Sequence, residues 1–379
     1  MSLLDYETLR VIWWVLLGVL LIGFAVTGGF DLGVGILLPF IGRRDGERRV
    51  VINAIGPFWE GNQVWLVLGA GAIFAAWPLL YAVAFSGFYP AMFLVLLALI
   101  LRPVGFKFRS KMTGTRWRTT WDWLLFLGGF VPALIFGVAV GNALVGAPFT
   151  FDDSLRMTYD GGLFDLLTPF PLLTGLVSVA MLTMHGGAYL ALKTEEPIAG
   201  RARRASFFAA IIFILLFAAA GYWATELEGY RIVGAFPHDS DSNPLGKAVI
   251  RVAGAWYANY GTMPWTIAAP CLGMGGAVLA ALAIRLRWNG LGFVTSALAV
   301  AGTVATAGVS MFPFLLPSSL DPRSSLTVWD ASSSQATLFN MLVAAAIFVP
   351  VVIGYTAFVY RVLWGRVSEA QVSADHSSY

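Results

Sequence analysis

The sequence predicts an all-α polytopic membrane protein that crosses the bilayer about nine times. Hydrophobic residues make up 58% of the 379 positions and charged residues only 12%, roughly half the charged share of an average soluble domain. A helix needs about 20 apolar residues to cross the hydrocarbon core. Long stretches contain no Asp, Glu, Lys or Arg, namely 61–101, 123–151, 205–225, 252–284, 288–320 and 331–360.

Hydropathy and helix-breaking residues place the spans in order. Trp77-Pro78 separates the second span from the third, because proline begins a helix more readily than it continues one. No polar stretch is long enough for a separate domain, so residues 1–379 are expected to form a single transmembrane domain. The expected helices are about 11–41, 54–77, 79–101, 123–147, 166–192, 205–225, 262–284, 290–314 and 336–360.

The positions of Lys and Arg predict the orientation. Eighteen of the 24 basic residues follow the first, third, fifth, seventh and ninth spans, and the other six lie on the opposite side. Basic residues concentrate in cytoplasmic loops of membrane proteins. We therefore expect the N-terminus outside and the C-terminus in the cytoplasm.

The composition also excludes several classes of protein. The net charge is +3, but the basic residues lie in short loops as topology signals, so no nucleic-acid partner is expected. Cys271 is the single cysteine, which excludes an internal disulfide and a cysteine-based metal site. Of the three histidines only His185 is expected at membrane depth, His238 and His376 lying in an outer loop and the tail. A lone intramembrane histidine is more often a hydrogen-bonded packing residue than a haem ligand, so we expect no metal and no haem here.

Two acids within the predicted spans are candidate functional residues, because charges in a membrane are costly. Asp31 precedes Arg43 by 12 residues, roughly 18 Å along a helix, and Glu60 follows Arg49 by 11, roughly 16 Å. Both acids are therefore expected at a similar depth, reached from the cytoplasmic side. Each is either a packing residue, hydrogen-bonded to a neighbouring helix, or part of a proton relay.

Glycines and aromatic residues surround these acids. Gly29 and Gly33 form a small-xxx-small pair that predicts close approach of another helix. Glu60 lies between Trp59 and the polar residues that lead to Trp65, where we expect it to be buried.

In collinear order along the whole chain, short motifs resemble subunit 2 of the cytochrome bd-type ubiquinol oxidases. Their combination is specific to that family, although no single motif is. The motifs are 5–14 (DYETLRVIWW), 29–33 (GFDLG), 59–65 (WEGNQVW), 85–89 (FSGFY), 101–106 (LRPVGF), 116–118 (RWR), 121–123 (WDW), 310–314 (SMFPF), 317–319 (PSS) and 326–335 (LTVWDASSSQ).

The resemblance implies two four-helix bundles plus one peripheral helix, in a complex of the bacterial inner (cytoplasmic) membrane that oxidises quinol and reduces dioxygen to water. The N-terminus would then lie on the periplasmic side. Such a complex builds a proton-motive force without pumping, since quinol protons leave outside and reaction protons come from the cytoplasm. Haems b and d and the quinol-oxidising loop belong to the partner, subunit 1, and none is expected in this chain. A structural quinone and a small accessory subunit occur in some members.

The resemblance also implies roles for individual residues. Glu60 matches an acid assigned to proton uptake, and Trp65, with Trp59 beside it, matches a tryptophan near the proposed route of oxygen access. Many members have Asp at the position of Glu60, and many have an acid at the position of Gly28. A relay role at Gly28 is therefore absent or taken by Asp31.

Two alternatives to an oxidase subunit remain at this point. A secondary transporter or proton channel often shows inverted repeats and paired broken helices around a midplane site. The acids of the first two spans have no counterparts in the later spans, which disfavours that class. The other alternative is a pure scaffold, in which Asp31 and Glu60 only pack helices.

Overall fold

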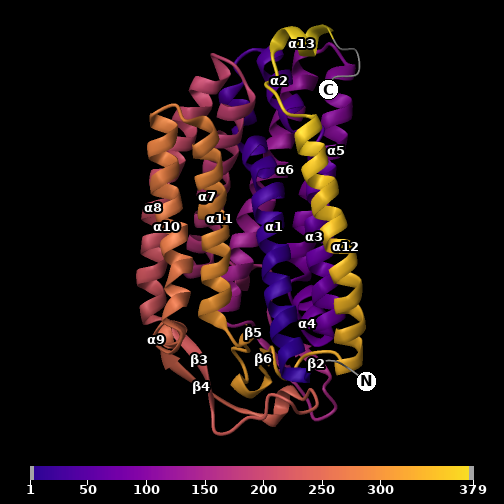
Figure 1. Cartoon of the computed structure of the whole chain (residues 1–379), viewed down its shortest axis with the longest axis vertical. Coiled ribbons are helices and arrows are strands. Elements are labelled where there is room, and N and C mark those ends of the chain that lie inside the picture. Colours follow the sequence, from indigo (N-terminus) through magenta and orange to yellow (C-terminus); the bar gives the residue numbers. More distant parts are fainter. Residues whose placement is uncertain (1–3, 375–379) are drawn as a thin grey trace.

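Long helices run side by side along one axis of the chain in the computed structural model, which describes residues 4–374 (Figure 1). Eight helices of this part are long and apolar enough to cross a membrane. α3 follows nearly the same direction but is less apolar, because polar residues fill its first turn. The long helices are α1 (Tyr6–Ile41), α3 (Trp59–Ala76), α5 (Tyr89–Phe108), α6 (Thr115–Val145), α7 (Pro169–Lys193), α8 (Ile198–Glu226), α10 (Ala268–Arg285), α11 (Asn289–Met311) and α12 (Gln335–Val362).

Helices lie at the positions of the expected spans, but several of their bounds differ, as at the start of α8 (Ile198, expected at 205) and the end of α5 (Phe108, expected at 101). The third span is divided into α4 (Pro78–Gly87) and α5, which restart around Phe88. Pro90 lies in the first turn of α5, where its missing N–H leaves no hydrogen bond unmade. α6 begins at Thr115, well before the expected start at 123, because the charged side chains of its first turns form ion pairs and hydrogen bonds.

The helices form the two expected four-helix bundles. In the first, α1, α3, the α4–α5 pair and α6 contact one another in a ring, and in the second α7, α8, α10 and α11 do so. α1 and α6 pack against α7, which joins the bundles. α12 lies outside both bundles against α1 and α3, as Figure 1 shows in yellow. No residue of its central stretch is fully buried by the rest of the chain.

The junction between the bundles depends on glycines. A Cβ built on Gly33 of α1 would lie 1.9 Å from the carbonyl oxygen of Leu182 in α7 and 3.1 Å from the Cα of Gly186. One on Gly29 would lie 2.8 Å from Leu182 Cδ2. The predicted close approach at Gly29 and Gly33 is confirmed, and its partner is α7.

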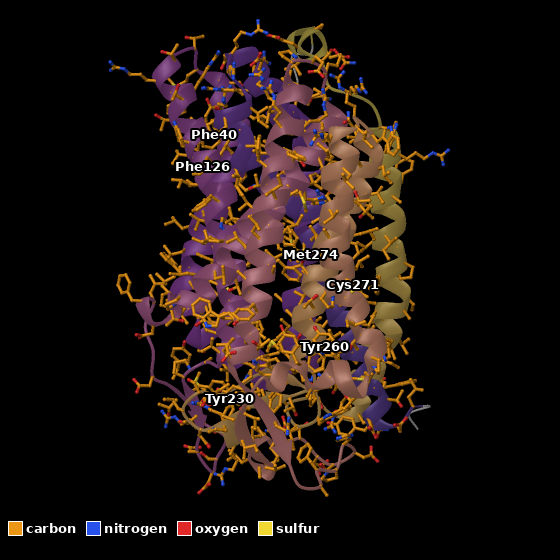
Figure 2. The ribbon with its side chains drawn as sticks, turned by 90° about the vertical axis from the view of Figure 1, so that its left-hand side faces the viewer. Phe40, Phe126, Tyr230, Tyr260, Cys271 and Met274 are labelled. Atoms are coloured by element: carbon orange, nitrogen blue, oxygen red, sulfur yellow. The ribbon has the colours of Figure 1, made fainter. Side chains whose placement is uncertain are left out.

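The two ends of the bundle differ in character. The short helices α2 (Asp45–Ile55) and α13 (Glu369–Ala374) lie at one end with the basic loops (Figure 1). At the other end lie α9 (Ala258–Thr262) and three antiparallel hairpins: β1 (Phe149–Phe151) with β2 (Met157–Tyr159), β3 (Glu228–Val233) with β4 (Ala248–Ala253), and β5 (Phe314–Leu316) with β6 (Leu326–Thr327). Figure 2 shows the same polarity, with Tyr230 at the strand end and Phe40 and Phe126 toward the other. The sequence did not predict these strands, because each is at most six residues long.

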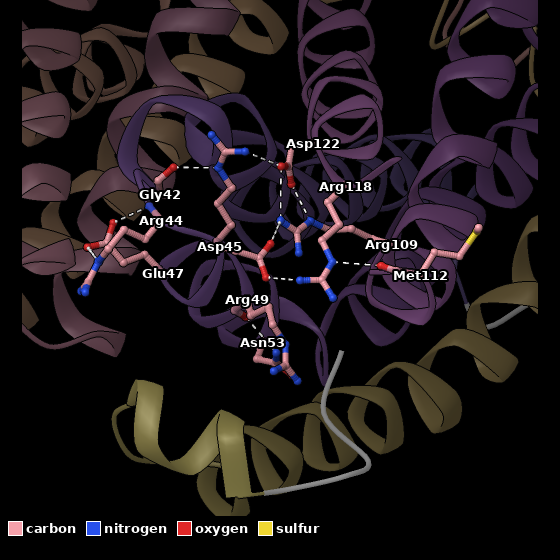
Figure 3. Close-up of polar contacts among 11 residues, drawn as sticks. Gly42, Arg44, Asp45, Glu47, Arg49, Asn53, Arg109, Met112, Arg118 and Asp122 are labelled. Atoms are coloured by element: carbon pink, nitrogen blue, oxygen red, sulfur yellow. Dashed lines mark hydrogen bonds and ion pairs between the residues drawn. The ribbon is translucent and has the colours of Figure 1, made fainter. Parts of the chain in front are cut away.

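At the α2 end a network of ion pairs fixes α2 to the bundle (Figure 3). Asp122 of α6 accepts from Arg109 Nε at 2.6 Å and from Arg48 of α2 at 2.7 Å. Asp45 of α2 pairs with Arg109 at 2.8 Å and with Arg118 at 2.6 Å. The side chains of Arg109 and Asp122 are both almost fully buried, so removing either partner would strand a buried charge.

At the strand end, the first helix is tied to distant parts of the chain. Arg10 is completely buried and donates to Ser332 Oγ at 2.8 Å and to the carbonyl oxygens of His238 and Ser240 at 2.5 and 3.0 Å. Its guanidinium also lies 3.5 Å above the ring of Tyr6. The loop before α12 is therefore held by α1.

Candidate functional site

Asp31 lies in the middle of the first bundle, held by residues of two other helices. Its side chain is 1% exposed, and Oδ2 accepts a hydrogen bond from Asn62 Nδ2 of α3 at 2.9 Å. Asn62 Oδ1 in turn accepts from the hydroxyl of Tyr360 in α12 at 2.8 Å. The peripheral helix thus completes a chain of hydrogen bonds that orients the carboxyl group.

Asp31 shares its surroundings with a charged residue of α5, Arg102. Asp31 and Arg102 line one small cavity of about 10 Å³, which is the space for a single water molecule. Within residues 4–374, neither Asp31 Oδ1 nor Arg102 Nη2 has a hydrogen-bond partner. Asp31 and Arg102 attract each other electrostatically, but no direct ion pair joins them among the described residues. Buried polar atoms are rarely left unpaired, so this geometry fits a bridging water.

Helix α2 separates this cavity from the end of the molecule. Val51, Ile52 and Ile55 of α2 line the cavity beside Asp31. The ion pairs of Asp45 and the neighbouring arginines hold α2 in this place. The carboxyl group is therefore covered by one amphipathic helix at the end that carries the basic loops, while the strand end lies far along α1.

Glu60 does not join this cluster. The prediction that Glu60 is buried is wrong for the described chain, because its side chain is exposed on the outer face of α3. α3 turns Asn62, not Glu60, toward Asp31. Residues at helical spacing from Glu60 share its face and are exposed and apolar: Val64, Val67 and Phe74. Glu60 is thus an ionisable residue at the end of an apolar stripe.

The two tryptophans of the motif are buried, as expected for packing residues. The Trp59 ring lies 5.2 Å from the Phe106 ring and 5.7 Å from the guanidinium of Arg102. Trp65 packs on α1 at Gly23, where a Cβ would lie 2.7 Å from the indole. The indole nitrogens of both have no hydrogen-bond partner among the residues described. At Gly28 the ring of Phe24 fills the space that a side chain would need.

Sequence reasoning missed three residues of the site. Arg102 is one of the basic residues that follow the third predicted span, which served only to predict the orientation, although it lies inside α5. Asn62 was part of the motif around Glu60 but had no assigned role. Tyr360 carried no signal, since a tyrosine near the end of a span is ordinary. Arg102 directly follows the charge-free stretch 61–101, and this position was the one clue that the sequence offered.

The residues around His185 do not fit a haem ligand. His185 is fully buried, and both ring nitrogens are engaged: Nδ1 with Ser296 Oγ at 2.8 Å and Nε2 with the carbonyl oxygen of Val26 at 2.9 Å. Its ring stacks on Phe293 with 5.0 Å between centroids. His238, in the loop between β3 and β4, contacts Glu7 of α1. His376 lies outside the described residues. Among residues 4–374, no group of three or more His, Cys, Asp or Glu could hold a metal ion.

Outside the spans, one acid of α2 is strongly stabilised in its charged form. Burial alone would raise the pKa of Glu47, but hydrogen bonds from the Arg201 side chain and from the Arg43 and Arg44 amides lower it to about 2. Arg201 Nη2 lies 2.9 Å from the carboxylate. This contact links α2 to the second bundle, as the Asp122 contacts link it to the first.

Known proteins are similar to this chain over all or nearly all of its length. The chain matches the sequence profile of the family described as cytochrome bd terminal oxidase subunit II over residues 9–363. It is 49% identical over 379 residues, all of both chains, to cytochrome bd-I ubiquinol oxidase subunit 2 of Escherichia coli (strain K12). It is 34% identical over 367 residues to cytochrome bd ubiquinol oxidase subunit 2 of Bacillus subtilis (strain 168), covering 96% of this chain and 98% of that one.

A solved structure shares the fold. The structure of bd oxidase from Geobacillus thermodenitrificans contains a chain that superposes with a TM-score of 0.67 at 16% identity, covering 94% of this chain and 98% of that one. The sequence matches and the fold agree, and the chain belongs to the cytochrome bd terminal oxidase subunit II family.

Proposed function

We propose that this chain is the haem-free membrane subunit of a bacterial quinol oxidase, and that it takes up protons from the cytoplasm. It supports a haem-bearing subunit 1 that oxidises quinol and reduces dioxygen to water in the aerobic respiratory chain. Family membership carries the first part, and the relatives are named as ubiquinol oxidase subunits. The buried Asp31 cluster is the observation that carries the second part.

Asp31 has the features that a proton carrier needs. Asn62 fixes one carboxyl oxygen, and the other has no hydrogen-bond partner among residues 4–374. Asp31 and Arg102 line a cavity of water size. A carboxyl group can accept a proton from a neighbouring water and release it again without moving its helix. Intramembrane acids that face the interior of a bundle mark proton and ion pathways.

Glu60 has the position of an acid at a subunit contact. An ionisable group facing lipid in an apolar stripe is costly, so such a face is more stable when a protein covers it. The partner subunit 1 is the proposed cover of the Glu60 face of α3. Glu60 then passes protons between this chain and the partner, and Asp31 forms the store behind it.

The orientation follows from the basic loops. The positive-inside rule places the end with α2 and α13 in the cytoplasm and the hairpin end in the periplasm. The site is thus reached from the cytoplasm across α2. The resemblance assigns haems b and d to the partner, and the engagement of both His185 nitrogens within this chain supports that part of the proposal. A structural quinone and a small accessory subunit stay predictions of the resemblance.

The test is Glu60→Gln in the assembled complex, which keeps size and most hydrogen bonding. Oxygen consumption with quinol should fall at least about tenfold, roughly 1.4 kcal/mol of barrier, with assembly and haem content unchanged. Glu60→Asp should keep much of the activity, since it retains the carboxyl group. Val67→Ala, on the same exposed stripe, is the matched control and should turn over at the parental rate.

Three outcomes would separate the alternatives. Parental turnover of Glu60→Gln would remove the relay role and leave Glu60 as a packing residue. Loss of the partner on purification would make Glu60 an assembly contact. A pure scaffold predicts that both Glu60→Gln and Asp31→Asn leave proton uptake unchanged, whereas a transporter predicts proton or substrate flux in the chain alone.

A further inference from the structure

A second cavity lies far from Asp31, between the ends of α8 and α10 at the α2 end of the molecule. Its volume is about 720 Å³, much larger than the space beside Asp31. Four arginines line it, together with two phenylalanines. These residues are Arg203, Arg204, Arg285, Arg287, Phe207 and Phe208. We call this feature the arginine groove.

The arginine groove has excess positive charge. Its single acid, Glu196, forms an ion pair with Arg203, and this hydrogen bond lowers the pKa of Glu196, so the acid stays charged and already matched. Within residues 4–374, Arg204 and Arg285 have no ion-pair partner. Arg285 lies over the Phe207 ring, with 6.0 Å from Cζ to the ring centroid. A planar guanidinium matches a phosphate group through two parallel hydrogen bonds.

Apolar side chains continue from the groove toward the middle of the bundle. On α8, Phe208 and Leu215 are 60% and 64% exposed and follow Arg204 at helical spacing. On α10, the side chains of Leu279 and Leu282, which precede Arg285 by six and three residues, are also exposed. This is the face that Figure 2 turns toward the viewer, with Cys271 and Met274 labelled on α10. The arginine groove thus lies at the end of two rows of exposed apolar side chains.

We propose that the arginine groove binds the phosphate headgroup of an anionic phospholipid from the leaflet at the α2 end. The arginines hold the phosphate, and the acyl chains lie along the apolar faces of α8 and α10. Charge complementarity and the rows of exposed apolar side chains select a lipid over a free phosphate ion, which would use only the arginines. Basic pockets between membrane helices bind anionic headgroups by the same physics. The site is independent of the proton pathway.

Native mass spectrometry of the delipidated complex tests the assignment, with phosphatidylglycerol and phosphatidylcholine as probes. Phosphatidylglycerol should be retained at a defined stoichiometry and phosphatidylcholine should be lost at low collision energy. The double variant Arg204→Gln/Arg285→Gln should weaken phosphatidylglycerol binding by roughly tenfold or more, since two surface charges are removed. The charge-matched control is Lys111→Gln/Arg116→Gln, at exposed positions of the same end outside the groove, and should bind as the parent does.

Each remaining outcome decides the question. Equal retention of the two lipids by the parent complex would overturn the proposal without any variant. Equal loss of binding in the control variant would show a diffuse surface charge effect and overturn the site. Competition by inorganic phosphate at the concentration of the lipid would identify a free anion as the ligand and overturn the lipid assignment. Unchanged melting of the groove variant would show that weaker binding reflects the site and not unfolding.

Discussion

Replacing Gly33 by alanine should separate the two bundles, because no space exists for a methyl group there. The added Cβ would lie 1.9 Å from the carbonyl oxygen of Leu182, while Cβ atoms essentially never come within 3.0 Å of another heavy atom. α1 and α7 must therefore move apart by about 1 Å or more. The obstacle is backbone, which cannot rotate away as a side chain can. Overpacking of this kind costs about 1–3 kcal/mol, and we expect the upper part of that range.

Purified complexes carrying Gly33→Ala should melt several degrees below the parent in a detergent thermal-shift assay. Helix association in membranes depends on close packing, so little else compensates for the lost contact. Gly18→Ala is the matched control: it lies in the same helix with nothing within 4 Å of the added Cβ, and should melt as the parent does or slightly higher. Equal melting of Gly33→Ala and Gly18→Ala would refute the reasoning that this approach holds the bundles together.

Three further expectations concern separate parts of the chain. His185→Ala should lower thermal stability by roughly 1–3 kcal/mol through the lost buried hydrogen bonds, yet leave haem per complex unchanged; loss of one haem would make His185 a ligand. Ser240→Cys in a Cys271→Ser background should react with an impermeant thiol reagent in intact cells, and labelling only after permeabilisation would reverse the orientation. Glu47 has a folded pKa of about 2, below its unfolded value, so it contributes stability above about pH 5 that is lost as the pH falls toward 2. The difference in melting temperature between the parent and Glu47→Gln should therefore shrink as the pH falls over that range. A difference that grew instead would contradict the ion-pair model.

The fold was predictable from the sequence because membrane physics leaves few choices. Every backbone polar group must be satisfied within the bilayer, so long apolar runs become helices whose number and order follow from hydropathy. Two of the boundaries that differ, at the start of α6 and around Phe88, depend on ion pairs and on a proline in the first turn of a helix. The hairpins were missed because a strand of a few residues has no distinctive periodicity.

The site was only partly predictable. Asp31 stood out as a charge within an apolar helix, and the structure confirms its burial. The sequence does not tell which face of α3 turns inward. Glu60 and Asn62 are two positions apart and so lie on nearly opposite faces of the helix, and it is Asn62 that contacts Asp31. Tyr360 lies 329 positions after Asp31, and contacts of such separation have no signature in a single sequence.

The peripheral position of α12 sets an order of events during synthesis. N-terminal segments of a chain leave the ribosome and fold first, and α12 is made after nearly everything else. Asn62 therefore holds Asp31 without the Tyr360 hydroxyl until the last helix has inserted. The acceptors of Arg10, namely Ser332, His238 and Ser240, all precede α12. A truncated chain that ends before α12 would leave only the Asp31 cluster incomplete. Quality-control proteases could thus distinguish finished from unfinished subunits before any partner is engaged.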